Sequence, residues 1–554
     1  MRTHLLAAAA LAVLLGTPSA ALAQGQIIIV NVDGVDEGFN DPTPAEPVGG
    51  NPGTTLGQQR LNVFERAADI WEAALQPTND VFVTAAFNPL APNVLGSAGT
   101  TFVFSDFPGA ELSGTWYHSA LADQLASEDL NPGFADINAQ FSSNFVFYLG
   151  FDNNEGTLVD LLPVVLHELG HGLGFANFVS EAAGTLFLGS PDVYSEYTYD
   201  VVTGKIWNEM TDVERAASAI NVRKVSWSGL AVNDAVPDVL SPGEPYVGVS
   251  SPPGLGPFML GTASFGPPLV SPGVTGDVAL ADDGVAPGSD ACTPLPAGSL
   301  AGKIALVDRG TCTFVVKVKN AQDAGAVAVI VADFAAGSPP AGLGGADPTI
   351  TITSGRITLA DGNLLKASLA AGAVNATLGL DLSILAGTDR VEGLMMVAAL
   401  NPVVPGSSIS HYEAVASRNQ LMEPAINNDL TSSVQPPEDL TLSLMTDIGW
   451  FSDRDGVPDG RDSCLGSDIG PTVVIGTCDS KVANVVFENG CTISDNVQAC
   501  YDSRRHRHHG GFASCVARYT AKLVRMDVIS EREKGAIQAC AAQDRRDHDH
   551  DDGR

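Results

Sequence analysis

The segment 161–175, LLPVVLHELGHGLGF, constrains the fold of this 554-residue chain more than any other stretch. Its apolar residues predict a buried helix, and Pro163 is compatible with the first helical turn. His167 and His171 are four residues apart, so both imidazoles project from one face of that helix and can hold one zinc ion. Glu168 lies beside them and can take a proton from a water molecule on that ion. The segment therefore predicts a metal centre with a carboxylate base.

Three glycines and the scarcity of histidine argue against a chance arrangement of these residues. Gly170, Gly172 and Gly174 would each weaken an ordinary helix by about 1 kcal/mol, so a segment selected only for helix stability should avoid them. Between residues 24 and 505 there are four histidines, at positions 118, 167, 171 and 411, and two of them occupy the motif. The pattern thus favours a zinc site.

A catalytic zinc site needs a third protein ligand, which in the extended motif stands six residues after the second histidine. That position is Asn177, whose neutral amide is a poor zinc ligand. His411 is the preferred replacement, whereas His118, beside Trp116 and Tyr117, is expected to have a structural or substrate-side role. A carboxylate ligand remains open, as in zinc peptidases that use two histidines and one acidic residue. The candidates for that ligand are Glu181, Asp192 and Glu196.

The motifs HELGHGLGF, Ser-His-Tyr at 410–412 and Leu-Met-Glu-Pro at 421–424 together resemble the leishmanolysin branch of the metzincin metallopeptidases. The resemblance implies a metzincin-like catalytic domain in which an insertion separates the second histidine from the third. It implies that His167, His171 and His411 bind zinc, that Glu168 is the general base, and that Met422 forms a methionine turn beneath the metal. The chain departs from the common pattern at Asn177 and at Tyr412, where such motifs often carry tryptophan.

The 240 residues between His171 and His411 leave room for a whole inserted domain. From about 236 to 385 the chain is rich in Gly and Pro, with a strand at 303–308, a helix at 314–324 and an apolar strand at 326–333. Residues 302–333 resemble the core of the protease-associated (PA) domain. That resemblance implies a disulfide between Cys292 and Cys312, and a domain that covers the cleft, selects substrates, contacts partners or only stabilises the chain.

The remaining segments predict an α+β catalytic domain and a small disulfide-rich C-terminal module. Strands at 27–32 and 81–87 flank a helix at 61–75, and helices at 512–526 and 529–542 carry Cys515 and Cys540. The predicted divisions are a signal peptide at 1–23, the catalytic domain at 24–235 and 386–450, the PA insertion at 236–385, an Asp-rich segment at 451–465, the Cys-rich module at 466–543 and a disordered charged tail at 544–554.

Two further charged segments offer candidate cation or partner sites near the C-terminus. The first segment has four closely spaced carboxylates, Asp453, Asp455, Asp459 and Asp462. Such a group can bind calcium, and ordinary Asp-Gly turns explain the same residues equally well. The run RRHRHH at 504–509 can bind a metal or an acidic partner, and a solvated basic loop is the favoured interpretation.

Charge and targeting signals restrict the class of protein. Lys and Arg total 29 against 64 Asp and Glu, and the formal charge of -35 disfavours nucleic acid and anionic lipid as partners. Arg2, an apolar run from Leu5 and an Ala-Leu-Ala site before Gln24 predict a secretion signal. The eight cysteines then indicate disulfides, and no later segment is apolar for long enough to span a bilayer. We expect an extracellular or periplasmic protein.

These observations predict a secreted zinc metalloendopeptidase that acts on protein or peptide substrates, with zinc and, through the Asp-rich segment, calcium as its ions. One alternative is a non-catalytic binding or adhesion protein with a structural metal site. The other is a serine peptidase carrying a PA domain, although the chain has no Gly-x-Ser-x-Gly nucleophile elbow.

Overall fold

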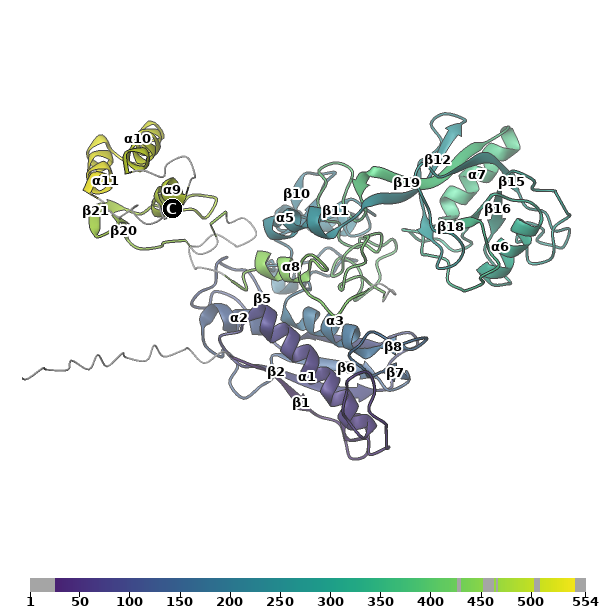
Figure 1. The fold of residues 1–554 in the computed structure, drawn as a ribbon, viewed down its shortest axis with the longest axis horizontal. Helices are drawn as coiled ribbons and strands as arrows, with labels where there is room; N and C mark the ends of the chain where they lie inside the picture. The colour runs from purple at the N-terminus through teal and green to yellow at the C-terminus, as the bar shows by residue number, and fades with distance from the viewer. Residues whose placement is uncertain (1–24, 426–429, 452–462, 465–466, 503–508, 544–554) are drawn as a thin grey trace, which may run out of the picture.

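The computed structural model describes residues 25–425, 430–451, 463–464, 467–502 and 509–543. It contains an N-terminal lobe, a central region of short strands and loops, an inserted domain and a C-terminal module (Figure 1). No helix of the described part is long and apolar enough to cross a bilayer. The predicted signal peptide, the charged tail, residues 504–508 and the four aspartates proposed for calcium lie outside the described residues.

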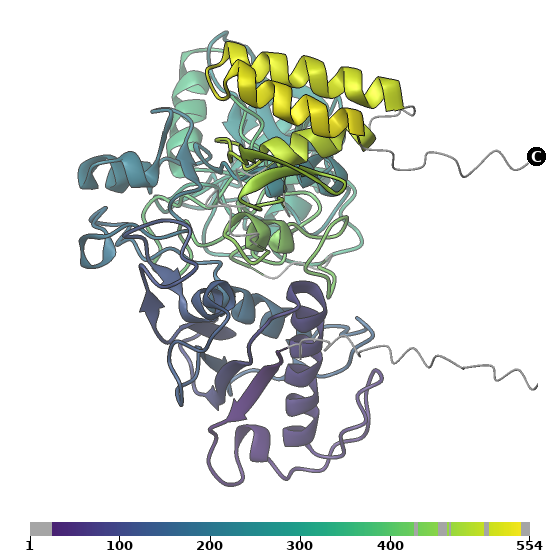
Figure 2. The same cartoon turned by 90° about the vertical axis from the view of Figure 1, so that its left-hand side faces the viewer.

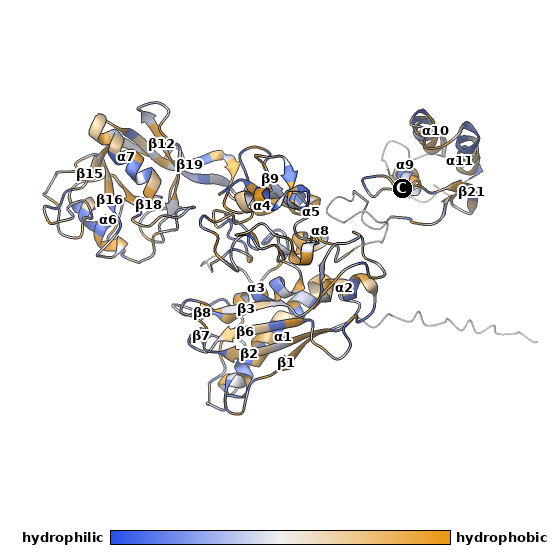
Figure 3. Cartoon of the chain, turned by 180° about the vertical axis from the view of Figure 1, so that it is seen from behind, coloured by the Kyte–Doolittle hydropathy of each residue, from blue (hydrophilic) through white to orange (hydrophobic). Residues whose placement is uncertain are grey.

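The N-terminal lobe is built on a mixed four-stranded sheet with strand order β1-β2-β6-β3. β1, β2 and β6 run parallel, and β3 joins β6 antiparallel as an edge strand. Hydrophobic residues dominate β2, whose side chains are largely buried (Figure 3). The elements of the lobe are β1 Ile27–Asn31, α1 Leu56–Leu75, β2 Val81–Asn88, β3 Gly96–Thr100, β4 Val103–Phe104, β5 Tyr117–His118, α2 Ser119–Ala126, β6 Ile137–Ser142, β7 Phe147–Tyr148, β8 Val159–Asp160 and α3 Leu161–Leu173.

Helices α1 and α3 lie against each other over this sheet (Figure 1). α1 begins five residues before the predicted helix, because the Thr55 hydroxyl accepts a hydrogen bond from the Gln58 amide and caps it. Apolar periodicity alone could not reveal that first polar turn. The Trp71 indole of α1 donates to the Leu166 carbonyl of α3 at 3.1 Å, which fixes the two helices to each other.

The central region joins segments from both sides of the insertion. Its short strands β9 and β11 pair antiparallel. Single bridges then join Ser226 of β11 to Met396, and Val397 to Tyr412. The carboxylate of Asp447 accepts hydrogen bonds from the Ala231 and Val232 amides and from the Trp227 indole. It thereby caps a helix 215 residues earlier in sequence. The elements are β9 Thr198–Asp200, β10 Lys205–Ile206, α4 Asp212–Ser218, β11 Val225–Trp227, α5 Leu230–Val239 and α8 Thr441–Asp447.

The inserted domain is an eight-stranded sheet with order β13-β12-β19-β15-β16-β17-β18-β14. Its first long strand, β12, pairs antiparallel with its last, β19, from Pro242 opposite Leu385 to Ser251 opposite Asn375. The chain therefore enters and leaves the domain through adjacent strands. The elements are β12 Pro242–Ser251, β13 Phe258–Met259, β14 Gly261–Thr262, β15 Val274–Leu280, β16 Ile304–Asp308, α6 Phe314–Asp323, β17 Ala328–Ala332, β18 Thr353–Ile357, α7 Leu359–Ala371 and β19 Asn375–Leu385.

A disulfide joins Cys292 to Cys312 in the inserted domain, as the PA resemblance implied. Three more lie in the C-terminal module, where Cys464 pairs with Cys491, Cys478 with Cys540, and Cys500 with Cys515. The described chain is thus a mixed α/β protein with four disulfides.

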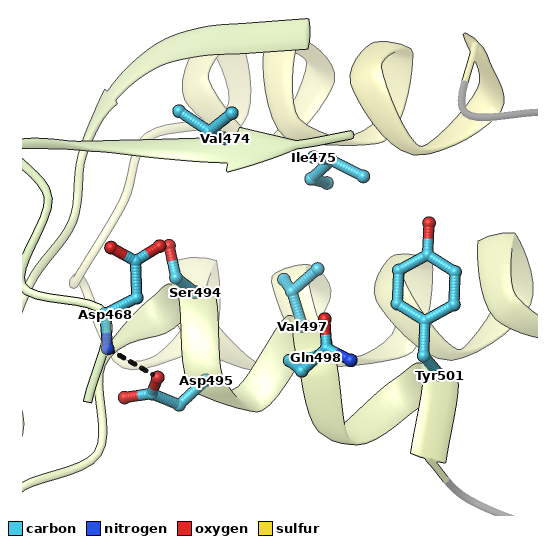
Figure 4. A pocket seen from close by; sticks show the side chains of 8 residues that line it. All are labelled: Asp468, Val474, Ile475, Ser494, Asp495, Val497, Gln498 and Tyr501. Atoms are coloured by element: carbon cyan, nitrogen blue, oxygen red, sulfur yellow. Dashed lines mark hydrogen bonds between the residues drawn. The ribbon is translucent and has the colours of Figure 1, made fainter. Parts of the chain in front are cut away.

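The C-terminal module is a hairpin packed with three helices, of which α10 and α11 lie side by side (Figure 2). Its elements are β20 Thr472–Ile475, β21 Cys478–Ala483, α9 Ile493–Asp502, α10 His509–Arg525 and α11 Glu531–Gln543. A cavity of about 280 Å³ lies between the hairpin and α9 (Figure 4). Its lining residues are Asp468, Val474, Ile475, Ser494, Asp495, Val497, Gln498 and Tyr501.

Replacing Asp447 by alanine is expected to lower the free energy of unfolding by about 2–4 kcal/mol, because three donors would lose their buried acceptor. Urea unfolding measures this effect. Asp238→Ala, on an exposed position of α5, is the matched control and should cost no more than about 0.5 kcal/mol. Equal losses in the two variants would show that Asp447 does not hold the two chain segments together.

Candidate metal centre

Helix α3 presents the predicted motif in the interior of the molecule. Asp160 caps the helix by accepting a hydrogen bond from the Leu162 amide, and Gly174 ends it with φ +145°, a conformation that favours glycine. A side chain at Gly170 would lie 2.9 Å from the Met422 sulfur, and one at Gly172 would lie 2.5 Å from Ile137 of β6. The glycines therefore allow close approach of the neighbouring segments, at the expense of helix propensity.

The structure brings His167, His171 and His411 together. Each ring is oriented through its Nδ1 by a backbone carbonyl: His167 by Leu421 at 2.7 Å, His171 by Phe175 at 2.8 Å and His411 by Ser407 at 3.0 Å. A carbonyl can only accept, so each Nδ1 carries the proton and each Nε2 keeps a free lone pair.

The three Nε2 atoms converge with separations of 3.1, 3.2 and 3.2 Å. Three lone pairs at this distance repel one another unless a cation lies between them. Tetrahedral zinc with Zn–N bonds of about 2.0–2.1 Å would place its nitrogen ligands about 3.3 Å apart, so the donor set fits that ion.

Burial lowers the pKa of all three imidazoles, and that of His171 to about 3. Each ring is therefore neutral at physiological pH, which is the protonation state that binds a metal. Glu168 differs, because burial raises the pKa of its carboxyl to about 8. The Ala98 amide of β3 donates a hydrogen bond to this carboxylate and partly offsets the effect of burial.

The segment around Met422 packs against α3, the helix that carries the first two histidines. Met422 is fully buried against Gly170, and its carbonyl accepts a hydrogen bond from the Tyr412 amide at 2.8 Å. The Asp439 carboxylate accepts from the Leu421 amide at 2.6 Å and so fixes the residue whose carbonyl orients His167. Sequence reasoning missed Asp439, since nothing in its local sequence links it to a site eighteen residues away.

Asn177, which stands where the extended motif has its third histidine, supports the loop of His411. Its side-chain amide donates to the Ser410 hydroxyl at 3.0 Å, and its backbone amide contacts the same oxygen at 3.2 Å. The position thus helps to place the third histidine although it supplies no ligand atom of its own to the cluster.

The alternative ligands bind elsewhere in the described chain. Asp192 accepts from the Phe178 and Ser195 amides, Glu196 from the Asn208 side chain, and Glu181 from Asn177. None of these carboxylates belongs to the histidine cluster.

His118 is 1% exposed and its ring lies 4.5 Å from that of Phe178. Among the described residues, neither of its ring nitrogens has a hydrogen-bond partner, and the histidine cluster does not include it. The structural or substrate-side role expected for His118 stays a prediction.

Comparison with known proteins identifies a family match inside the inserted domain. Residues 274–365 match the PA domain family. The chain is 42% identical over 84 residues to a probable leucine aminopeptidase 2 of Aspergillus fumigatus, covering 15% of this chain and 17% of that protein. It is 39% identical over 107 residues to a receptor homology region, transmembrane domain- and RING domain-containing protein 1 of Oryza sativa subsp. japonica, covering 19% of each.

Two solved structures show weak similarity. The zinc aminopeptidase BSAP of Bacillus subtilis matches at 20% identity and a TM-score of 0.20, over 37% of this chain and 44% of that one. The subtilisin-like protease Apa1 of Pseudoalteromonas sp. AS-11 matches at 20% identity and a TM-score of 0.19, over 26% and 34%. The chain spans less than a fifth of the length of these two curated relatives, so their activities do not transfer to it. What the comparisons establish is that the insertion contains a PA domain.

The buried neutral histidines predict a specific pH dependence of the metal-free protein. The unfolded chain protonates His171 near pH 6.5 and the folded chain near pH 3, so this group reduces stability as the pH falls through that window. Between about pH 4 and pH 6, His171→Gln should reduce the slope of unfolding free energy against pH by about 1 kcal/mol per unit. Urea titrations in the presence of a chelator measure the slope, and an unchanged slope would contradict the assigned protonation state.

Proposed function

We propose that this chain is a secreted zinc metalloendopeptidase of the leishmanolysin-like metzincin type. The observation that carries the proposal is the convergence of three neutral Nε2 atoms beside a buried glutamate. Among the described residues the cluster has three members, which leaves one coordination position for water or substrate. Catalytic zinc sites have this composition, whereas structural zinc sites use four protein ligands. The composition therefore disfavours a purely structural metal in a binding or adhesion protein.

When bound, zinc polarises the scissile carbonyl and lowers the pKa of its water molecule. His167, His171 and His411 would hold the ion through their Nε2 atoms. Glu168 takes the proton from the attacking water and passes it to the leaving amine. Burial raises the pKa of the Glu168 carboxyl, which makes its carboxylate form a stronger base and so suits this role.

The position of β3 supports an extended peptide as the substrate. β3 is the last strand in its sheet, and no other strand of the described residues pairs with its outer edge. The Ala98 amide of this strand donates to Glu168, so the edge passes directly beside the general base. An extended peptide that adds to this edge by main-chain hydrogen bonds would bring an internal bond to Glu168.

The disulfides support the proposed location outside the cytoplasm, because four such bonds persist in oxidising compartments. The domain divisions predicted from the sequence, with the catalytic domain in two segments around the PA insertion, form part of the same proposal. Calcium binding by the Asp-rich segment, at 451–465, is kept as a separate hypothesis that equilibrium dialysis with calcium can test.

Glu168→Gln is expected to retain zinc and to lower kcat/KM for an internally quenched peptide by about 10²–10⁴-fold, because the general base is lost. Glu196→Gln, a carboxylate that binds Asn208 away from the cluster, is the matched control and should keep both zinc and activity. Wild-type activity in Glu168→Gln would remove this residue from the mechanism.

An endopeptidase cleaves a peptide whose N-terminus is blocked, whereas an aminopeptidase needs a free N-terminal amine. We expect the chain to cleave an N-acetylated peptide at a rate similar to that of the same peptide with a free N-terminus. Chelation of zinc should abolish cleavage of both peptides. Cleavage of the free peptide alone, one residue at a time, would show that the chain is an aminopeptidase.

A further inference from the structure

A group of five charged residues lies where the inserted domain joins the central region. We call this group the neck cluster; its members are Arg223, Glu244, Asp381, Arg390 and Glu413. Glu244 of β12 binds Arg223 at 3.0 Å and also Arg390 at 2.5 Å, and Arg390 binds Asp381 of β19 at 2.8 Å. Arg223 lies 3.6 Å from Glu413. The neck cluster therefore connects β12 and β19, the strands by which the chain enters and leaves the inserted domain, to the central region.

Glu413 stands two residues after His411 and is 1% exposed. Its amide donates to the Met396 carbonyl at 3.0 Å, and the His411 carbonyl accepts from the Ala398 amide at 2.8 Å. A shift of the Glu413 side chain would therefore be transmitted to His411 through a short segment that is hydrogen-bonded to residues 396 and 398.

Arg223 is the cation shared by the two buried glutamates. It is 9% exposed and has φ +56°, an uncommon conformation for a residue with a side chain. Among the described residues, Arg223 is the cation within ion-pair distance of the Glu413 carboxylate, so removing it would leave Glu413 buried without a counter-ion. A buried carboxylate without a cation is costly, so the Glu413 side chain would shift from its present position towards water.

The inserted domain holds the same stretch of chain at a second point. Ser338, in the loop after β17, and Asn401 exchange two backbone hydrogen bonds, each of 2.9 Å. Asn401 precedes Ser407, whose carbonyl orients the His411 ring. Residues 396–413 are therefore anchored to the inserted domain on both sides of the loop that carries the third histidine.

We propose that Arg223 is a positioning residue for His411, and that Glu244 of the inserted domain holds Arg223 in place, so that the PA insertion sets the geometry of the third ligand. This inference rests on the proposed zinc peptidase function for its effect on catalysis. It gives the insertion a role inside the metal centre that is independent of substrate binding by the PA domain.

The test compares Arg223→Met with the double variant Arg223→Met/Glu413→Gln in the full chain. The single variant should bind zinc about 10–100-fold more weakly in a chelator competition, as expected when an outer-shell group is lost. The double variant removes the uncompensated carboxylate and should recover most of that affinity.

Glu244→Gln should weaken zinc binding less than Arg223→Met does, because the ion pair between Arg223 and Glu413 is still present in this variant. Lys319→Met, which breaks an exposed ion pair with Asp323 in α6, is the matched control and should bind zinc like the wild type.

Hydrogen exchange of residues 408–413 in the metal-free protein separates failure of this inference from failure of the proposed function. Exchange should be faster in Arg223→Met than in Lys319→Met whether or not the chain is a peptidase. Unchanged exchange and zinc affinity in Arg223→Met would overturn the inference, as would a double variant no better than the single one. If the wild type does not bind zinc, the proposed function fails and the exchange comparison alone decides the inference.

Discussion

Three backbone carbonyls determine what the histidine cluster can do. Leu421, Phe175 and Ser407 each accept the proton of an imidazole Nδ1, which leaves three unprotonated Nε2 atoms facing one point. Burial keeps the rings neutral, so a cation rather than protons would relieve the mutual repulsion of the lone pairs. Phe175 and Ser407 each lie four residues from the histidine that they orient, whereas Leu421 lies 254 residues from His167. Bringing the loop of His411 and the segment of Leu421 to α3 is therefore the main structural requirement of the site.

The antiparallel pairing of β12 with β19 makes this arrangement compatible with a domain between the second and third histidines. Because the insertion begins and ends on adjacent strands, the flanking segments meet as they would across a short loop. Residues 395–397 then bridge β11 to the segment that carries His411, and Asp447 joins α8 to the start of α5. The insertion thus separates the ligands in sequence and keeps them together in space.

Much of the site could be predicted because its chemistry is local. The spacing of His167 and His171 is set by one helical turn, and the shortage of histidines left His411 and His118 as the remaining imidazoles. The PA core could be predicted for the same reason, since a β-α-β unit of about thirty residues carries its own periodicity.

The supporting contacts could not be predicted, because they join residues without a shared sequence pattern. Asp439 acts through the Leu421 amide and Asn177 through the Ser410 hydroxyl, and both are visible only once the chain has folded. The start of α1 was missed for a different reason, since a polar capped turn has no apolar periodicity.

The central claim is that His411 completes one metal centre with the two histidines of α3. Diffraction from zinc-loaded crystals at the zinc absorption edge tests it most directly. The account predicts one anomalous peak bonded to the Nε2 atoms of His167, His171 and His411, at about 2.0–2.1 Å from each. A peak held by His167, His171 and a carboxylate, with His411 turned away, would contradict it.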